Sequence, residues 1–303
     1  MNEHKMEHGH SHDIESIKGV NLLIVVLLNF IITLAELIGG IYSGSLSLIS
    51  DALHNFSDGI AIIISYIAIK LASKDKDEKK TFGYKRATIL TALLNATVLI
   101  AISLFLFKEA YVEFLHPQPI NGGIVIWVAL LGLIANFIGV LLLQKGSQGD
   151  MNIKSSYLHL LSDALSSLGV VIGGIIIYYF DIYWVDPLLT LFIGLYVMKE
   201  SFEIVKKSIN ILMQGVPEKI DILAIAQDIQ KIAGIENVHH VHVWGIDESN
   251  INFEAHVNIK DRLVSETSAI LEEIEHKLLH HGIMHTTIQF EYNCCNGVEI
   301  IKK

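Results

Sequence analysis

Long apolar stretches alternate with short polar links over the first two thirds of the chain. A helix needs about 18 or more mainly apolar residues to cross about 30 Å of hydrocarbon. Stretches of that length are approximately Ile17–Tyr42, Leu46–Ala72, Ala87–Leu115, Ile120–Gln144, Met151–Phe180 and Trp184–Ile209. Because the links are short, we expect an all-α, antiparallel bundle of six membrane-spanning helices over residues 17–209.

Basic side chains are confined to alternate links. The link Lys70–Arg86 is rich in lysine, Lys145 and Lys154 flank the link after the fourth stretch, and lysines recur from Lys199 to Lys207. The other three links contain no Lys or Arg. Positive charge is retained on the cytoplasmic side of a membrane, so we predict that both termini are cytoplasmic.

The pattern changes after Ile209, and residues 210–303 contain no stretch long enough to span a membrane. Apolar periodicity and turn residues predict a soluble α+β domain of order αββαβ. Its elements are a helix over Glu218–Ala233, strands over Val238–Trp244 and Ile251–Ile259, a helix over Glu266–His281 and a strand over Thr286–Tyr292. The polar residues between the first two strands predict a hairpin.

Composition supports a membrane protein and excludes other classes. Of 303 residues, 51% are hydrophobic and 18% charged, and the mean hydropathy is +0.48. The net charge of −10 argues against nucleic acid as a partner. The only cysteines, Cys294 and Cys295, are adjacent, which disfavours a disulfide and leaves metal binding by thiolates as the alternative.

One short pattern occurs twice within the predicted spans. His54-Asn55-Phe56-Ser57-Asp58 and His159-Leu160-Leu161-Ser162-Asp163 both place an aspartate four residues after a histidine. Positions i and i+4 share a helix face, so two such faces can form a cage of two imidazoles and two carboxylates. This set suits a tetrahedral Zn²⁺ ion.

Charge suggests how such a cage would work. Two carboxylates neutralise a dication in a medium of low dielectric constant, and the empty cage favours protons. We therefore expect metal and protons to exchange at His54, Asp58, His159 and Asp163. The alternative for any single histidine or aspartate is a satisfied interhelical hydrogen bond. Asp51 and Glu36 also lie in spans, but neither has a partner of ligand type at i+4.

Gly44 to Asp58, paired with His159 to Asp163, closely resembles the cation diffusion facilitator family of zinc transporters. Further matching segments, which extend the resemblance over nearly the whole chain, are Phe82-Gly83-Tyr84, Val238–Trp244 and Thr286–Glu291. The resemblance implies a homodimeric metal–proton antiporter, not an enzyme, with a metallochaperone-like cytosolic domain. It assigns the transport site to the four residues of the cage and favours Zn²⁺, with some Cd²⁺ or Co²⁺. The short, histidine-free link Gln144–Met151 favours a prokaryotic plasma-membrane protein.

A second metal site is expected in the cytosolic domain. His239 and His256 fall on the two strands of the predicted hairpin, where they can be cross-strand neighbours. By resemblance, these histidines and Glu291 match metal-binding positions, and His285 is a further candidate. A regulatory or structural Zn²⁺ there would tie two subunits together. His240, His276, His280 and His281 are interpreted as solvated residues.

The two tails offer further ligands. His4, His8, His10 and His12 either capture metal at the cytoplasmic mouth or form a tail (residues 1–16) without a role. Some members of the family bind zinc between C-terminal cysteines and the N-terminal segment. Cys294 and Cys295 are therefore a hypothetical site shared with His8, His10 or His12.

Other functions meet specific objections in the sequence. A membrane metallohydrolase of the His-Glu-x-x-His type is excluded because that motif is absent. An ATP-driven pump is excluded because no Gly-x-x-x-x-Gly-Lys-Ser/Thr loop occurs. A metal-gated channel or a membrane metal receptor stays open as the alternative. A carrier would saturate and return protons, whereas a channel would conduct without stoichiometric exchange.

Overall fold

The computed structural model describes residues 27, 29–144, 151–294 and 300, without the side chains of residues 62, 143, 151–156, 158 and 159. The chain divides into two compact units. One comprises Met1–Ile63 and Asn95–Phe202, and the other comprises Ile64–Leu94 and Glu203–Lys303. The second unit therefore joins the ends of three helices, and the loop between the first two of them, to the C-terminal domain. The predicted tail of residues 1–16 lies outside the described residues.

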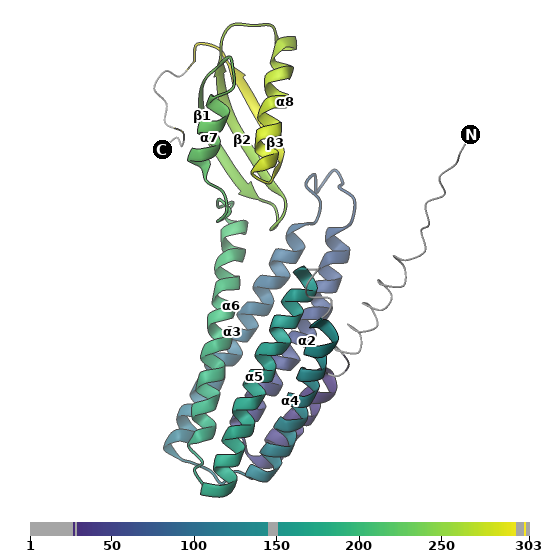
Figure 1. The fold of residues 1–303 in the computed structure, drawn as a ribbon, viewed down its shortest axis with the longest axis vertical. Helices are drawn as coiled ribbons and strands as arrows, with labels where there is room; N and C mark the ends of the chain where they lie inside the picture. Colours follow the sequence, from purple (N-terminus) through teal and green to yellow (C-terminus); the bar gives the residue numbers. More distant parts are fainter. Residues whose placement is uncertain (1–26, 28, 145–150, 295–299, 301–303) are drawn as a thin grey trace, which may run out of the picture. The chain divides into compact units, whose positions relative to one another are not determined.

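Helices dominate the described part of residues 29–212 (Figure 1). The first is Asn29–Ser43. It covers the second part of the predicted span Ile17–Tyr42, whose residues 17–26 and 28 lie outside the described residues. The helices that follow are α2 (Leu46–Ala72), α3 (Arg86–Leu115), α4 (Gly122–Gln144), α5 (Met151–Phe180) and α6 (Val185–Leu212). Hydropathy alone thus placed the described ends of these helices to within a few residues.

Within the described residues, four helices are long and apolar enough to cross a membrane. They are Leu46–Ala72, Arg86–Leu115, Gly122–Leu142 and Leu160–Phe180. Asn29–Ser43 is a shorter apolar helix. α6 has 28 residues, but Asp186 near its start and charged side chains from Lys199 onward shorten its uncharged stretch. The structure therefore supports a helical transmembrane domain with at least these four apolar helices.

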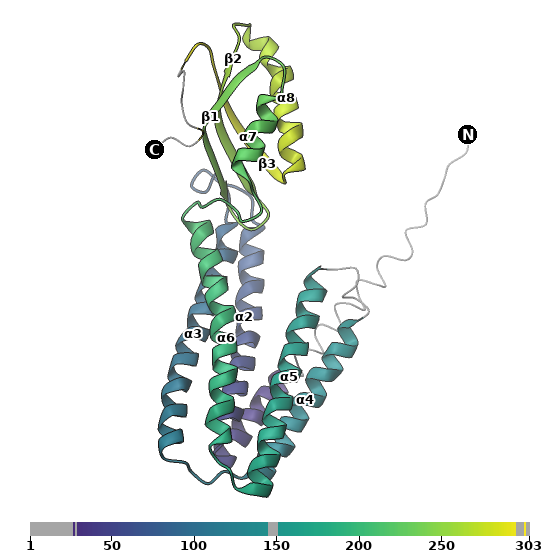
Figure 2. The ribbon, with the colours of Figure 1, turned by 60° about the vertical axis from the view of Figure 1, so that its left-hand side comes forward.

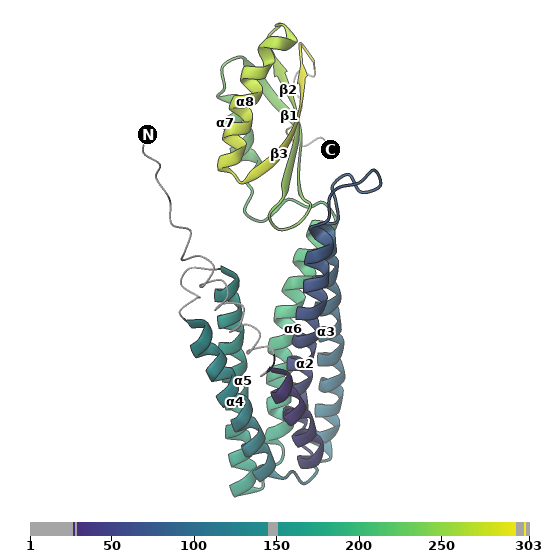
Figure 3. The same cartoon turned by 90° about the vertical axis from the view of Figure 1, so that its right-hand side faces the viewer.

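α4 and α5 pack against each other, as all three ribbon views show (Figures 1, 2 and 3). Glycine permits the close approach, because a Cβ atom on Gly122 would lie 2.7 Å from the backbone nitrogen of Tyr178. The outward side chains of α4 are large and apolar, and Trp127 is 70% exposed. Such a surface is typical of a helix that contacts lipid.

Asp186, at the start of α6, caps the N-terminus of α2. Its carboxylate accepts hydrogen bonds from the hydroxyls of Ser45 and Ser47 at 2.6 and 2.5 Å. It also accepts from the backbone nitrogens of Leu46 and Ser47 at 2.6 and 3.0 Å. A carboxylate at a helix N-terminus satisfies orphan N–H groups and complements the helix dipole. This fully buried residue therefore fixes α2 to a helix about 140 residues later in the chain.

The C-terminal domain has the predicted order of elements (Figure 2). They are α7 (Ile222–Gln230), β1 (Ile235–Gly245), β2 (Ile251–Ile259), α8 (Val264–His280) and β3 (Ile283–Glu291). α7 is shorter than the predicted helix from Glu218. It begins after Asp221, whose side chain accepts hydrogen bonds from the backbone nitrogens of Leu223 and Ala224.

The three strands form one sheet in the order β1-β2-β3. β1 and β2 pair antiparallel, which confirms the predicted hairpin, and β3 returns parallel to β2 after α8. α7 and α8 cover one face of this sheet (Figure 3). The core between them consists of apolar side chains such as Ile229, Phe253, Val257, Ile274 and Leu278. The opposite face of the sheet carries the polar residues that alternate with this core.

Candidate metal centre

His54 and Asp58 lie one turn apart on α2, as their spacing requires. The Nε2 atom of His54 is 3.4 Å from a carboxylate oxygen of Asp58. Each side chain is 16% exposed, so both are largely shielded from solvent. The structure thus brings together the first of the two predicted pairs.

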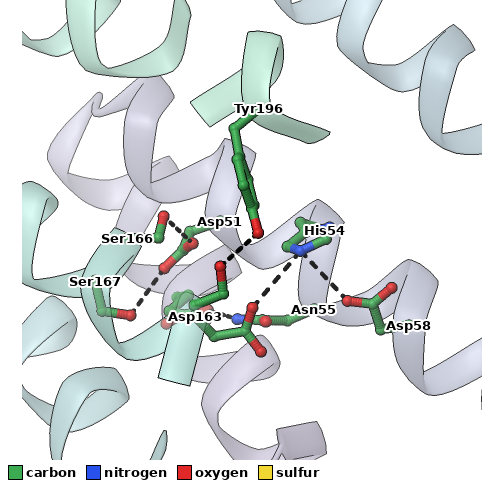
Figure 4. A network of polar contacts seen from close by, with 10 residues as sticks. Asp51, His54, Asn55, Asp58, Asp163, Ser166, Ser167 and Tyr196 are labelled. Carbon is green, nitrogen blue, oxygen red and sulfur yellow. Dashed lines mark hydrogen bonds and ion pairs between the residues drawn. The ribbon is translucent and has the colours of Figure 1, made fainter. Parts of the chain in front are cut away.

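Asp163 approaches the same histidine from α5. Its Oδ1 atom is 3.7 Å from Nε2 of His54, and its side chain is 7% exposed. Figure 4 shows the imidazole of His54 between the carboxylates of Asp58 and Asp163. His159 precedes Asp163 by one turn of α5, but its side chain lies outside what the structure describes.

A cavity of about 360 Å³ adjoins this cluster. His54, Ser162, Asp163, Ser166 and Tyr196 are its polar lining residues. Tyr196, on α6, has its hydroxyl 2.6 Å from the Oγ atom of Ser162 (Figure 4). Sequence reasoning missed this tyrosine, because a single tyrosine within an apolar helix has no partner of recognisable spacing.

Asp51 is engaged by hydrogen bonds between helices. The hydroxyls of Ser166 and Ser167 on α5 donate to its two carboxylate oxygens at 3.1 and 3.2 Å (Figure 4). Only 2% of Asp51 is exposed. Because α2 carries Asp51 and α5 carries both serines, these bonds set the alignment of the two helices that bear the cage residues.

Glu36 forms a second buried contact with α2. The side-chain nitrogen of Asn55 donates to its Oε2 atom at 2.9 Å, and the glutamate is fully buried. Its other carboxyl oxygen lies so close to Gly132 of α4 that a Cβ atom there would collide with it. Glu36 therefore ties its own helix to both α2 and α4.

The geometry around His54 favours a small cation. Two carboxylates from different helices can neutralise one dication, and an imidazole nitrogen is a good ligand for a borderline metal such as zinc. Neither α2 nor α5 supplies both carboxylates, so binding depends on the packing of the two helices. A rearrangement of that packing would weaken the site.

A second cluster lies on the open face of the cytosolic sheet. His239 pairs with His256 across β1 and β2, and Glu291 ends β3. One oxygen of Glu291 is 2.7 Å from Nδ1 of His256, and the other is 3.2 Å from Nε2 of His239. The three potential ligand atoms lie within 4.8 Å of one another. Nε2 of His239 and the Glu291 oxygen facing it are buried and have no hydrogen-bond partner among the described residues, which fits a metal ligand set.

Electrostatics favour the ionised form of Glu291. Burial alone would raise the pKa of this carboxyl, but hydrogen bonds from His256 and Gln289 outweigh that effect and lower it below its usual value. The thiol of Cys294 also donates a hydrogen bond to Glu291. The carboxylate thus remains ionised at mildly acidic pH, with a sulfur atom beside it.

Other predicted ligands of this domain are placed differently. His285 pairs with Asn252, towards the other end of β2, so the structure does not bring it to His239, His256 and Glu291 within one chain. Its ring lies edge-on to that of Phe82 at a centroid distance of 6.4 Å. Cys295 and the N-terminal histidines His4, His8, His10 and His12 lie outside the described residues.

His240 departs from the solvated position expected of it. The pairing of β1 with β2 shifts between His239 and His242, and His240 has a φ of 53°. Such a bulge re-aims a side chain. The ring of His240 lies 4.6 Å from that of His256 and 5.0 Å from that of His242. No pattern in the sequence marks the bulge, which explains why the prediction missed this contact.

Comparison with known proteins gives a family match for both domains of the chain. Residues 22–213 match the family model of the cation efflux transmembrane domain, and residues 217–293 match that of the cation efflux protein cytoplasmic domain. The chain is also 37% identical over 294 residues to the cadmium, cobalt and zinc/H(+)-K(+) antiporter of Bacillus subtilis, which covers 95% of this chain and 93% of that protein.

Two further relatives are similar over the same extent. The metal cation efflux system protein CzcD of Cupriavidus metallidurans is 36% identical, covering 96% of this chain and 92% of that protein. The zinc transporter ZitB of Escherichia coli is 34% identical, covering 96% and 95%. Together with the helical membrane domain and the small cytoplasmic sheet, these matches show that the chain belongs to the cation efflux family, the cation diffusion facilitators.

Proposed function

We propose that the chain exports Zn²⁺ across the membrane in exchange for protons, with His54, Asp58, His159 and Asp163 as the transport site. The observation that carries this proposal is the position of His54, whose Nε2 atom faces carboxylates of α2 and α5 at 3.4 and 3.7 Å. Family membership makes the chain a transporter and not an enzyme.

Coupling to protons follows from the charge of the site. Once the dication leaves, two carboxylates remain in a poorly solvated place, and protons are the simplest compensating charge. The Bacillus subtilis relative is named as an antiporter of metal against H⁺ and K⁺. Relatives named for zinc, and for cadmium with cobalt, support Zn²⁺ as the main substrate, with Cd²⁺ and Co²⁺ as further substrates.

The proposed topology has six spans in residues 17–209, with the first completed by residues before Asn29 and the sixth formed by α6. The lysines of alternate links support cytoplasmic termini. The plasma membrane of a prokaryote is the proposed location, in keeping with the bacterial sources of the relatives. Residues 210–303 would then meet the cytoplasmic metal pool.

In the cytosolic domain we assign a regulatory Zn²⁺ to His239, His256 and Glu291. Two nitrogen ligands and one oxygen leave a fourth tetrahedral position, which the thiol of Cys294 beside Glu291 or a residue of a second subunit would fill. The family model that matches this domain is named for dimerisation. A homodimer joined through these domains is therefore the proposed assembly.

Metal uptake into proteoliposomes tests the main proposal. The purified chain is reconstituted with an imposed pH gradient, and Zn²⁺, Cd²⁺, Co²⁺ and Mn²⁺ are offered in turn. We expect saturable Zn²⁺ uptake that stops when the gradient is collapsed. Asp163→Ala should abolish uptake of every ion, because the remaining carboxylate cannot neutralise a dication.

The same assay includes a matched control variant and tests the channel alternative. Asp181→Ala removes a carboxylate from the link between α5 and α6 and should leave uptake unchanged. Proton release is recorded alongside metal entry. Uptake that proceeds without proton movement would reject the antiport proposal and favour the metal-gated channel. Uptake that Asp163→Ala leaves intact would reject the four-residue transport site.

A further inference from the structure

A cavity of about 430 Å³ lies within the second unit, where α2 ends and α3 begins. Ligand pockets commonly have volumes of about 300–1,000 Å³. Leu71 of α2 and Arg86, Ala87 and Leu90 of α3 contribute to its wall. Both helices are long and apolar enough to span a membrane, and the cavity lies at the end of one and the start of the other.

The wall combines cationic and aromatic side chains. Lys80 and Arg86 supply positive charge, and Phe82, Tyr84 and Trp244 supply aromatic rings. Phe82 is 50% exposed. Tyrosine and tryptophan, which have a polar edge, favour the boundary between membrane and water, where lipid headgroups lie.

The charge of the loop suits an anion. From Lys70 to Arg86 the chain has seven basic and three acidic residues. Neither Lys80 nor Arg86 forms a salt bridge with another described residue, and the charge of Lys80 is the last of several influences that lower the pKa of Asp77. Asp77 accepts hydrogen bonds from the backbone nitrogens of Lys79 and Lys80 and from the hydroxyl of Tyr84.

The loop is also held in place, so the cavity is a formed site. Asp77 closes a turn onto Lys80, and the Tyr84 hydroxyl donates to its second oxygen at 2.8 Å. Nζ of Lys85 donates to Asn250 in the link between β1 and β2 at 2.5 Å. A ligand in the cavity would therefore touch both the membrane-proximal loop and, through Trp244 and Ile246, the cytosolic domain.

We propose that this cavity binds the headgroup of an anionic phospholipid, with Lys80 and Arg86 contacting the phosphate and the acyl chains passing along Leu71 and Leu90 into the bilayer. Clusters of basic residues just outside a membrane span attract acidic lipids. The site would let the lipid composition of the membrane influence the transporter. That regulatory consequence, unlike lipid binding itself, rests on the proposed transport function.

Lipid retention is the primary test. The full-length protein is purified in a non-ionic detergent with phosphatidylglycerol or phosphatidylcholine, and bound lipid is counted by native mass spectrometry. We expect phosphatidylglycerol to be retained, and Lys80→Gln/Arg86→Gln to reduce its affinity roughly 25-fold, because each basic residue that interacts with an anionic headgroup contributes roughly fivefold. Lys74→Gln/Lys79→Gln is the matched control, with the same loss of charge outside the cavity.

Additional measurements show which results would contradict the lipid site. If both double variants lose phosphatidylglycerol equally, or if inorganic phosphate displaces the lipid from the wild-type protein, a specific headgroup site is wrong. Should Lys80→Gln/Arg86→Gln fail to elute as a monodisperse protein, the single Lys80→Gln variant is measured in its place. Zn²⁺ uptake is then compared in vesicles with and without phosphatidylglycerol, which tests whether the lipid influences transport. Absence of any Zn²⁺ uptake would reject the transport proposal. The lipid-binding proposal would then be tested by the retention measurement alone.

Discussion

The membrane cluster and the cytosolic cluster both combine histidines with acidic residues, but in different proportions. In the membrane domain, two carboxylates accompany His54, and they come from α2 and α5. In the cytosolic domain, a single carboxylate, Glu291, accompanies His239 and His256. A dication beside one carboxylate keeps net charge unless a further anionic ligand, such as the thiolate of Cys294, completes the site. Two carboxylates neutralise a dication without any other anionic ligand, which a medium of low dielectric constant requires.

The clusters also differ in how their residues are brought together. His54 and Asp58 are neighbours through the helical repeat alone, whereas His239 and His256 meet only when β1 and β2 pair in register. Opening the contact between α2 and α5 would break the membrane cluster into halves. The cytosolic cluster lies within one small sheet, so a site there is suited to retain its ion. Release from the membrane cluster and retention in the cytosolic cluster are what the proposed transport and regulatory roles would require.

The sharpest test of this difference compares carboxylate removal in the two clusters. Asp58→Asn/Asp163→Asn should lower Zn²⁺ uptake by at least about 100-fold, since an uncompensated dication in a medium of low dielectric constant costs several kcal/mol. Glu291→Gln should change uptake by less than about threefold. Proteoliposome flux at matched protein density measures both. Equal losses would show that the cytosolic cluster also lies on the transport path.

A second test removes the support of the membrane cluster and leaves its ligands in place. Asp186→Asn weakens four hydrogen bonds at the N-terminus of α2, and bonds to a charged group contribute roughly 1.5–3 kcal/mol each. We expect uptake to fall about tenfold and the thermal unfolding temperature to drop by several degrees. Asp181→Asn, which changes an exposed aspartate five residues earlier, should alter neither quantity.

The third test concerns the fourth ligand of the cytosolic cluster. Co²⁺ replaces Zn²⁺ in tetrahedral sites and is visible by absorption, and a thiolate ligand adds a charge-transfer band in the near ultraviolet. Cys294→Ser should abolish that band and weaken Co²⁺ binding roughly tenfold, while Cys295→Ser should preserve it. Tetrahedral absorption without the band in the wild-type protein would assign the fourth position to another group. The absence of tetrahedral absorption would reject the site itself.

The smallest expected effect is on pH-dependent stability. Because the pKa of Glu291 is lowered in the folded protein, its contribution to stability is present above the unfolded pKa and is lost as the pH falls through the lower, folded value. The difference in unfolding temperature between wild type and Glu291→Gln, measured without metal, should therefore be constant near neutrality and shrink below about pH 4.5. A difference that grows on acidification would contradict this sign.

Much of this protein follows from local pattern. The described spans, the αββαβ order and the pairing of His54 with Asp58 depend on hydropathy and on the helical repeat, which act between residues close in the chain. The cross-strand contact of His239 and His256 was predictable for a similar reason, since a short link between two alternating stretches produces a hairpin.

Tertiary structure decided what joins distant segments. No local rule links Asp186 to Ser45 and Ser47, Tyr196 to Ser162, or Asp51 to α5, because each contact depends on which helices pack together and at what height. The shorter α7 and the bulge at His240 depend on a side-chain cap and on a register shift, neither of which leaves a periodic signal. Short-range geometry is encoded residue by residue, whereas packing is a property of the whole chain, and only the folded molecule reveals it.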